Sequence, residues 1–294
     1  MLNLYERRNK DKDRLLVIVG TTASGKSALA IRIAKEFGGE IISADSWQVY
    51  RGFDIGTSKP SAQERKEIKH HLMDVTDAES GFNAPKFKEL ATAAIKDIQN
   101  RDKLPILAGG TGLYIDSVLY DFGFLPNLGP EARAELDAMS LDELLKLAKR
   151  SKISLSGVDK RNKRRVVRAI EAMGEKPMKQ KLRAGTMVIG IKSSPDELRK
   201  RVEQRAERML KDGLEQEVKD LSQRYGWEIE PMKGIGYKEW QGYFKGTRSL
   251  EDTKAKIIKN TLDLAKRQMT WFKRNPDIKW FSSPDKAYAF LTNF

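Results

Sequence analysis

Short apolar runs alternate with longer amphipathic stretches along the first third of the chain. The run Leu15–Val19 precedes a helical pattern over 26–37, and two further apolar runs, Ile41–Ala44 and Leu104–Ala108, lie on either side of a helical stretch over 87–99. Alternation of strands and helices is typical of a parallel sheet covered by helices on both faces. The pattern therefore predicts an α/β fold.

The pattern changes from about residue 126 to residue 185, where charged helical segments replace the apolar runs. Met187–Ile191 then resumes the strand pattern. Ser194 and Glu197 form a capping box that opens the next helix, with Pro at its first position. The last long helix is predicted over 252–275, and its apolar stripe consists of Ile258, Leu262, Ala265, Met269 and Phe272.

The first apolar run leads directly into the sequence G-T-T-A-S-G-K-S, from Gly20 to Ser27. A strand, a glycine-framed loop and a helix in this order match the phosphate-binding pattern G-x-x-x-x-G-K-[ST], the P-loop. The glycines allow the backbone N–H groups to turn toward phosphate oxygens, and the helix dipole adds positive charge. Lys26 supplies a cation, and the hydroxyl of Ser27 is a ligand for Mg²⁺. The motif predicts a polyphosphate-binding protein without saying which polyphosphate it binds.

We therefore expect a P-loop NTPase-like parallel sheet flanked by helices, with a small all-helical insert domain. The core is assigned to residues 1–122 and 186–294, and the insert to residues 123–185. Ligands of such sheets bind beyond the carboxyl ends of the strands. The P-loop, Asp45 and Gly109–Gly112 all follow predicted strands, so we expect them to converge.

The composition shows a strong positive net charge and excludes several kinds of functional site. The chain has 55 Lys and Arg against 41 Asp and Glu, a net charge of +14, which favours an anionic partner such as nucleic acid over a merely solvated basic surface. Cysteine is absent, and the two histidines, His70 and His71, are adjacent, so disulfides, thiol nucleophiles and Cys- or His-rich metal sites are excluded. We assign the adjacent histidines to packing or hydrogen bonding. With no apolar stretch of ~20 residues, we expect a cytoplasmic protein.

Two charged residues are candidates for chemistry in the core. Asp45 follows a predicted strand, so it is either a general base beside bound phosphates or a loop residue that caps a turn. Arg205 lies on the apolar stripe of its helix, so it is either a phosphate clamp or one half of a structural salt bridge. The predicted strands that end at Ala108 and Ile191 are not followed by the acid that would hold Mg²⁺ in a nucleotide-hydrolysing protein. The P-loop thus favours a leaving polyphosphate over a hydrolytic motor.

Two basic stretches are candidates for nucleic-acid contact. On a helix, Arg161, Arg164, Arg165 and Arg168 share one face, which is either a contact for a phosphate backbone or a solvated surface. The second stretch, over 266–274, contains Trp271 and Phe272. We assign these two aromatic residues to packing in preference to stacking on bases.

Several blocks of the chain form a recognisable set. After G-T-T-A-S-G-K-S come S-A-D-S-W-Q-V-Y-R-G-F-D-I-G-T-S-K-P, H-H-L-M-D-V, A-G-G-T-G-L-Y, N-K-R-R-V-V-R-A-I-E, R-M-L-K-D-G-L-E-Q-E-V, G-I-G-Y-K-E and A-K-R-Q-M-T-W-F. In this order the blocks resemble the tRNA dimethylallyltransferase family, also called tRNA isopentenyltransferase. Thr21 departs from the family pattern, which usually has Pro there. The chain resembles the compact bacterial form of the family, and we expect a monomer.

The resemblance implies transfer of a dimethylallyl group from dimethylallyl diphosphate to N6 of adenosine 37 of tRNA, with diphosphate as leaving group and Mg²⁺ as cofactor. It implies a diphosphate site made of Gly20, Thr21, Thr22, Ala23, Ser24, Gly25, Lys26 and Ser27, with Ser27 on the metal. It implies that Asp45 accepts the proton from N6 and that Thr22 and Arg205 orient or stabilise the diphosphate.

The resemblance also implies a tRNA site with two parts. One part contacts the flipped-out adenosine and its neighbours and consists of Asp45, Ser46, Trp47, Gln48 and Thr111. The other grips the RNA backbone from the insert and consists of Arg164, Arg165, Val166, Val167 and Arg168. Two alternatives remain: an isopentenyltransferase acting on free AMP, ADP or ATP, and a non-catalytic RNA-binding P-loop protein. The insert and its arginines argue against the first, and Lys26, Asp45 and Arg205 argue against the second.

Overall fold

The computed structural model describes residues 13–125, 128–175 and 177–292 of the chain. The chain divides into two compact units, a core of Met1–Leu119 with Leu182–Phe294 and an insert of Tyr120–Lys181. Among the described residues, none of the helices has both the length and the apolar character needed to cross a bilayer.

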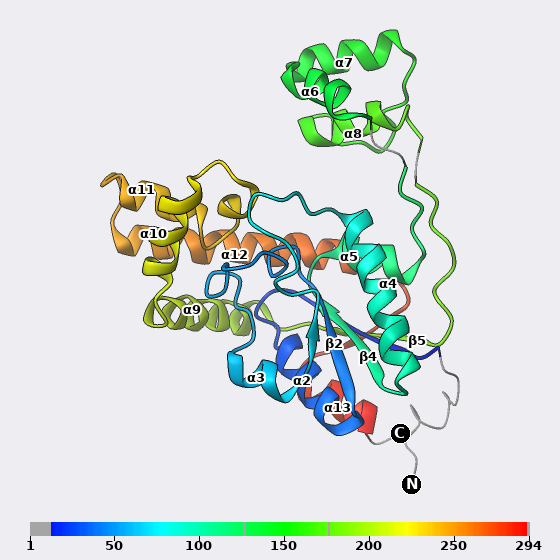
Figure 1. The fold of residues 1–294 in the computed structure, drawn as a ribbon, viewed down its shortest axis with the longest axis vertical. Helices are drawn as coiled ribbons and strands as arrows, with labels where there is room; N and C mark the ends of the chain where they lie inside the picture. The colour runs from blue at the N-terminus through cyan, green and yellow to red at the C-terminus, as the bar shows by residue number, and fades with distance from the viewer. Residues whose placement is uncertain (1–12, 126–127, 176, 293–294) are drawn as a thin grey trace. The chain divides into compact units, whose positions relative to one another are not determined.

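The core is built on a six-stranded sheet of parallel strands in the order β3-β2-β4-β1-β5-β6 (Figure 1). Val17 of the central strand β1 lies opposite Leu107 of β4 and Val188 of β5. All six residues of β1 are buried, as expected for a strand covered on both faces. The strands are β1 (Leu15–Gly20), β2 (Gly39–Ala44), β3 (His70–His71), β4 (Leu104–Gly109), β5 (Thr186–Ile191) and β6 (Ile278–Phe281).

Helices cover both faces of the sheet. Leu16 and Ile18 of β1 pack in one hydrophobic cluster with Leu29 and Ile33 of α2 and with Ala287 of α13. On the opposite face α4 packs against β4 and β2, and α5 packs against α4 and α12 (Figure 1). The α-helices of the core are α2 (Lys26–Phe37), α3 (Ala62–Glu67), α4 (Ala84–Asn100), α5 (Gly112–Leu119), α9 (Pro195–Lys211), α10 (Leu214–Tyr225), α11 (Gln241–Phe244), α12 (Leu250–Phe272) and α13 (Pro284–Thr292).

A second cluster of buried side chains joins the segment after β2 to α10, α12 and two short 3-10 helices, η1 (Glu230–Lys233) and η2 (Lys238–Trp240). It is rich in aromatic residues: Phe53 meets Tyr237 edge to face, with ring centroids 5.1 Å apart. This cluster fixes the loops on the side of the sheet where ligands are expected.

The insert consists of α6 (Pro130–Ala138), α7 (Leu141–Arg150) and α8 (Lys163–Glu171). These helices enclose a small core of their own that includes Leu144, Val166, Val167 and Ile170. Our sequence-based boundaries, 123–185, and the observed unit, Tyr120–Lys181, share residues 123–181.

The two connecting segments between core and insert are paired by backbone hydrogen bonds at both ends. Within the core, the N–H of Arg183 donates to the carbonyl of Leu119 over 2.8 Å. Within the insert, the N–H of Gln180 donates to the carbonyl of Tyr120 over 2.8 Å, and the N–H of Gly123 donates to that of Met178 over 2.9 Å. The chain therefore leaves the core and returns to it at adjacent positions.

The predicted capping box is confirmed, because the hydroxyl of Ser194 accepts from the N–H of Glu197 and the Glu197 carboxylate accepts from the N–H of Ser194. The apolar stripe predicted for the last long helix is only partly right. Ala265 and Phe272 are buried, but the third buried apolar residue of α12 is Ile257, and Ile258 is half-buried. The inward face of α12 also contains polar residues that the hydrophobic pattern assigns to solvent.

Candidate active site

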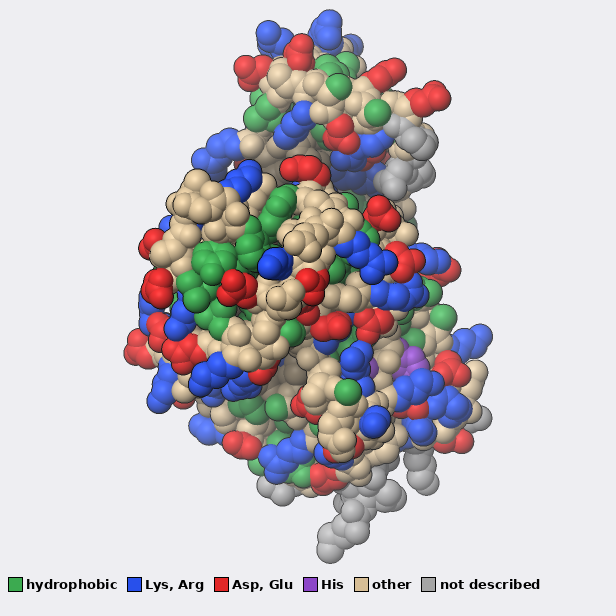
Figure 2. Space-filling view, turned by 60° about the vertical axis from the view of Figure 1, so that its left-hand side comes forward, with side chains coloured by type: hydrophobic (Ala, Val, Ile, Leu, Met, Phe, Trp, Pro, Cys, Tyr) green, Lys and Arg blue, Asp and Glu red, His purple; other side chains and the backbone are tan. Residues whose placement is uncertain are grey.

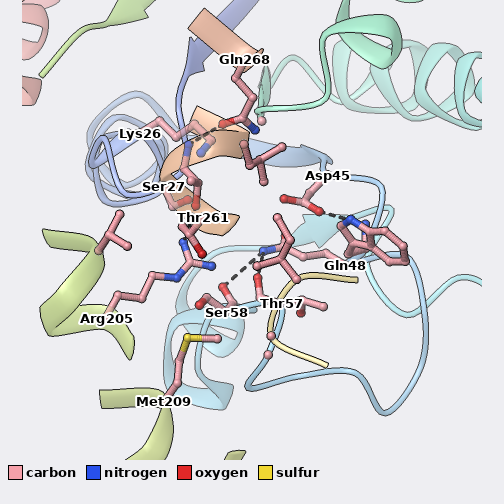
Figure 3. A pocket seen from close by; sticks show the side chains of 18 of the residues that line it. Lys26, Ser27, Asp45, Gln48, Thr57, Ser58, Arg205, Met209, Thr261 and Gln268 are labelled. Atoms are coloured by element: carbon pink, nitrogen blue, oxygen red, sulfur yellow. Dashed lines mark hydrogen bonds between the residues drawn. The ribbon is translucent and has the colours of Figure 1, made fainter. Parts of the chain in front are cut away.

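A pocket of about 110 Å³ lies beyond the carboxyl ends of β1, β2 and β4 (Figure 3). Its walls come from the P-loop, from the segments that follow β2, and from α9 and α12. The charged and polar side chains that line it are Thr22, Lys26, Ser27, Ser43, Asp45, Gln48, Thr57, Ser58, Arg205, Thr261 and Gln268. The expected convergence of the P-loop and Asp45 is therefore present.

The P-loop carries the cation that the motif requires. Gly25 caps α2 in the left-handed region, with φ 89°, which an L side chain rarely adopts. The next residue, Lys26, donates from Nζ to the carbonyl of Thr21 over 3.2 Å. Burial lowers the pKa of the Lys26 ammonium to about 8, while the nearby Asp45 carboxylate opposes this shift. Ser27 is exposed and lines the pocket next to Lys26.

Arg205 reaches the P-loop from α9. Its Nη1 donates to Oγ1 of Thr22 over 2.9 Å. Burial lowers the pKa of its guanidinium, and the Asp45 carboxylate again opposes the shift. Within the described residues Arg205 makes no ion pair, so its charge faces the pocket with a neutral hydroxyl as its partner (Figure 3). Of our two alternatives, a structural salt bridge therefore does not fit this arginine.

Of the two alternatives left open for Asp45, the turn-capping one is confirmed, and the general-base role stays a prediction. Its Oδ1 accepts from the backbone N–H of Trp47 over 2.9 Å, which is the turn-capping geometry. Its carboxylate also lines the pocket, on the opposite wall from Lys26 and Arg205 (Figure 3). The turn thus fixes the position of a carboxylate that faces two cations across a cavity.

The other residues predicted around Asp45 differ in how they reach the pocket. Trp47 and Gln48 line it. Thr111 and Ser46 are not among its lining residues. They join the ends of β4 and β2, because Oγ1 of Thr111 accepts from the N–H of Ser46 over 3.1 Å.

Gln48 is engaged at both ends of its amide. Its Oε1 accepts from the hydroxyl of Ser43 over 2.8 Å. Its Nε2 donates to the carbonyls of Thr57 and Ser58 over 3.3 and 3.2 Å (Figure 3). The orientation of this side chain is therefore set by two neighbouring backbone segments.

Sequence reasoning missed Gln268 of α12. Its Oε1 accepts from the N–H of Thr22 over 2.8 Å, and its Nε2 donates to the carbonyl of Gly110 over 3.1 Å. A methyl group added at Gly110 would lie 2.3 Å from that nitrogen, so the glycine is needed for the close approach. Thr261, one of the pocket residues on the same helix, was also missed. The signal that could have found them is a polar side chain on the face of α12 that points into the protein.

The RNA-binding residues predicted in the insert differ in their exposure to solvent. Arg164 and Arg165 are exposed on α8, whereas Val166 and Val167 are fully buried in the core of the insert. RNA contact at Val166 and Val167 stays a prediction, and the structure shows both side chains packed in the core of the insert. The valines hold the helix that presents the arginines.

Two other predicted members of the arginine face are placed differently. Arg168 is half-buried and donates to the carbonyl of Leu125 over 2.5 Å and to the Glu171 carboxylate over 3.3 Å. Arg161 precedes the helix, whose N-cap is Asn162. On the face shown in Figure 2, Lys and Arg side chains are interspersed with Asp and Glu.

The parallel sheet, the P-loop and the pocket beyond its strands define a P-loop α/β protein with two cationic side chains and a carboxylate in its pocket. The family model described as IPP transferase matches residues 48–275. The chain belongs to this family of transferase enzymes.

Relatives and solved structures agree with this assignment. A "tRNA dimethylallyltransferase" of Streptococcus uberis is 41% identical over 283 residues, which cover 94% of this chain and 93% of that protein. The crystal structure of a tRNA isopentenylpyrophosphate transferase from Bacillus halodurans has a TM-score of 0.73 at 35% identity and covers 96% and 95% of the two chains. A eukaryotic dimethylallyltransferase acting on tRNA has a TM-score of 0.81 at 28% identity, over 96% of this chain and 77% of that one.

Proposed function

We propose that this transferase moves the dimethylallyl group of dimethylallyl diphosphate to N6 of adenosine 37, next to the anticodon of tRNA. The observation that carries the proposal is the pocket in which Lys26 and Arg205 face the carboxylate of Asp45. A diphosphate leaving group needs the cations, and an amine nucleophile that loses a proton needs the carboxylate. Because the acceptor is tRNA, we place the reaction in the cytoplasm.

The donor diphosphate is held by the P-loop, from Gly20 to Ser27. As the bond between the prenyl carbon and the diphosphate oxygen breaks, negative charge grows on the diphosphate. This charge is stabilised by Lys26, Arg205 and the backbone N–H groups of the loop, which are already in position before the reaction starts. Thr22 orients Arg205 through the hydrogen bond between their side chains.

The acceptor nitrogen attacks the prenyl carbon from the other side of the pocket. A new C–N bond forms, diphosphate leaves, and the proton that N6 loses passes to the carboxylate of Asp45. The turn at Trp47 holds one oxygen of this carboxylate, which leaves the group fixed for the transfer.

Mg²⁺ would take more of its ligands from the substrate than from the protein. Within the described residues there is no cluster of three carboxylate, His or Cys side chains that would hold a metal alone. The exposed hydroxyl of Ser27 lies in the pocket, and Mg²⁺ is often bound by one or two protein oxygens together with substrate phosphates. When bound, the ion adds positive charge at the leaving diphosphate.

Residues of both the core and the insert bind the tRNA. Bases in RNA loops are unstacked at low cost, so adenosine 37 enters the pocket beside Trp47 and Gln48. Arg164 and Arg165 of the insert contact the phosphate backbone of the anticodon stem-loop, and their exposure on one helix supports this role.

The test is incubation of the protein with radiolabelled dimethylallyl diphosphate and Mg²⁺, with either tRNA or AMP as acceptor. We expect label in tRNA, at the adenosine next to the anticodon. A tRNA transcript with guanosine at that position is the matched control and should take up no label. Label in AMP alone would instead establish the free-nucleotide isopentenyltransferase, and no label in either would leave the RNA-binding alternative.

A further inference from the structure

Glu217 of α10 makes four hydrogen bonds, three to a segment that is far from it in sequence and one to Tyr237. Its Oε2 accepts from the backbone N–H groups of Asp54 and Ile55 over 3.1 and 2.8 Å. Its Oε1 accepts from the N–H of Gly56 over 3.0 Å and from the hydroxyl of Tyr237 over 2.7 Å. Three successive N–H groups form a concave anion site, and here a side chain of the protein fills it.

The segment that Glu217 holds leads into a wall of the pocket. Gly56, Thr57 and Ser58 all line the pocket. A methyl group added at Gly56 would lie 2.4 Å from the ring of Tyr237, so this backbone is pressed against the same tyrosine that bonds Glu217. The position of residues 54–58 therefore depends on the carboxylate of Glu217 and the hydroxyl of Tyr237 together.

The wall in turn orients Gln48. The carbonyls of Thr57 and Ser58 accept both described hydrogen bonds of the Gln48 Nε2. A shift of residues 56–58 would move these carbonyls and release the amide. Hydrogen bonds at both ends of the 54–58 backbone thus link Glu217 of α10 to a side chain in the pocket.

We propose that Glu217 is a positioning residue for the acceptor side of the pocket. This inference rests on the proposed function, in which Gln48 contacts the adenosine. Within the described residues Glu217 makes no ion pair. Hydrogen bonds to a charged acceptor are roughly twice as strong as neutral ones, so an uncharged isostere holds the segment less well. The donor side does not share this support, because the P-loop is held by Arg205 and Gln268.

The chain offers a matched control on the same helix. Glu215 is also half-buried and also accepts a tyrosine hydroxyl, that of Tyr243, over 3.0 Å. Its carboxylate makes no described bond to the 54–58 segment. Glu217→Gln and Glu215→Gln therefore remove the same charge from the same helix, but only the first weakens the pocket wall.

The experiment compares both variants with the wild-type chain in transfer from dimethylallyl diphosphate to tRNA. For Glu217→Gln we expect kcat/KM for tRNA to fall about tenfold, which corresponds to 1.4 kcal/mol, with KM for the donor unchanged. Glu215→Gln should match the wild type. The positioning role would be overturned by unchanged tRNA kinetics in Glu217→Gln, or by a rise in the donor KM as large as the fall in kcat/KM for tRNA.

Tyr237→Phe keeps the test valid if Glu217→Gln fails to fold. It removes one of the four hydrogen bonds and leaves the ring in place against Gly56, so we expect a smaller loss in kcat/KM for tRNA with the donor KM again unchanged. Normal kinetics for tRNA in this variant would count against the proposal. Failure of the proposed function itself is distinct, because wild-type protein would then not label tRNA at all.

Discussion

The side chain of Gln268 is hydrogen-bonded to the backbone of Thr22 across a sequence separation of 246 residues. The same amide donates to the carbonyl of Gly110. One side chain of α12 thus ties the P-loop after β1 to the loop after β4. The shape of the phosphate site depends on a residue that lies far outside the P-loop motif.

Replacement of Gln268 by Ala should weaken donor binding. The N–H of Thr22 and the carbonyl of Gly110 lose their partner, which costs roughly 1–3 kcal/mol for a buried group left unsatisfied. We expect the free energy of unfolding to fall by about this amount and the affinity for dimethylallyl diphosphate to fall with it. Urea unfolding and a binding titration measure the two. Thr270→Ala on the same helix removes only a bond to the carbonyl of Lys266 and should change neither.

The pKa of Lys26 near 8 should make donor binding depend on pH. In the unliganded protein the ammonium is charged below this value and neutral above it. We therefore expect the affinity for dimethylallyl diphosphate to fall above about pH 8, by at most about tenfold per pH unit. Lys26→Arg keeps its charge throughout this range. Its profile should show only the titration of the ligand, and a profile identical to that of the wild type would contradict the prediction.

The same shift has an opposite effect on the stability of the unliganded chain. The folded-state pKa of Lys26 is below the ordinary value of 10.5, so the unfolded chain binds more protons than the folded one between about pH 8 and 10.5. The contribution of Lys26 to the free energy of unfolding therefore rises with pH across this window. The difference between wild type and Lys26→Met in urea unfolding at both ends of the window measures it.

Substitution of Asp45 by Asn should separate catalysis from binding. The amide oxygen still accepts from the N–H of Trp47, so the turn is kept, but the group no longer takes up a proton. General-base catalysis contributes about 10²–10⁴ in rate, and we expect single-turnover transfer to fall by such a factor. Filter binding should show tRNA affinity close to that of the wild type. Transfer at the normal rate would exclude Asp45 as the base.

Arg164→Ala combined with Arg165→Ala should weaken tRNA binding and reduce its salt dependence. Loss of two phosphate contacts lowers the slope of log K against log salt by about 1.5. The pair Lys149→Ala and Arg150→Ala removes the same charge from another exposed helix of the insert and serves as the control. Equal slopes for the two double variants would show that only net charge matters.

Much of the sheet was predictable, because β1, β2, β4 and β5 contain apolar runs that are mostly or fully buried. β3 and β6 were missed. β3 is only the pair His70-His71, and β6 has four residues, of which Ile278 alone is buried. The hydrogen-bonding role predicted for the histidines is confirmed, since His70 bonds the carbonyl of Ile68 and His71 bonds the Glu40 carboxylate. Edge strands this short carry no periodicity that sequence reasoning can detect.

The residues of the site also differ in how far the sequence predicts them. Lys26, Asp45 and Arg205 follow from local motifs or from helix periodicity, and all three line the pocket. Gln268 and Glu217 act on loops that are distant in sequence, so only the tertiary fold reveals their partners. A polar residue on an inward helix face is the sequence signature that such residues leave.

The hydrogen bond between Leu119 and Arg183 closes the core at the point where the insert begins. All described strands and every residue that lines the pocket belong to the core. The insert is thus attached in the manner of a module: its length and surface can diverge without any change in strand register. Selection for a different RNA partner would be free to act on this segment while the chemistry of the pocket stays the same.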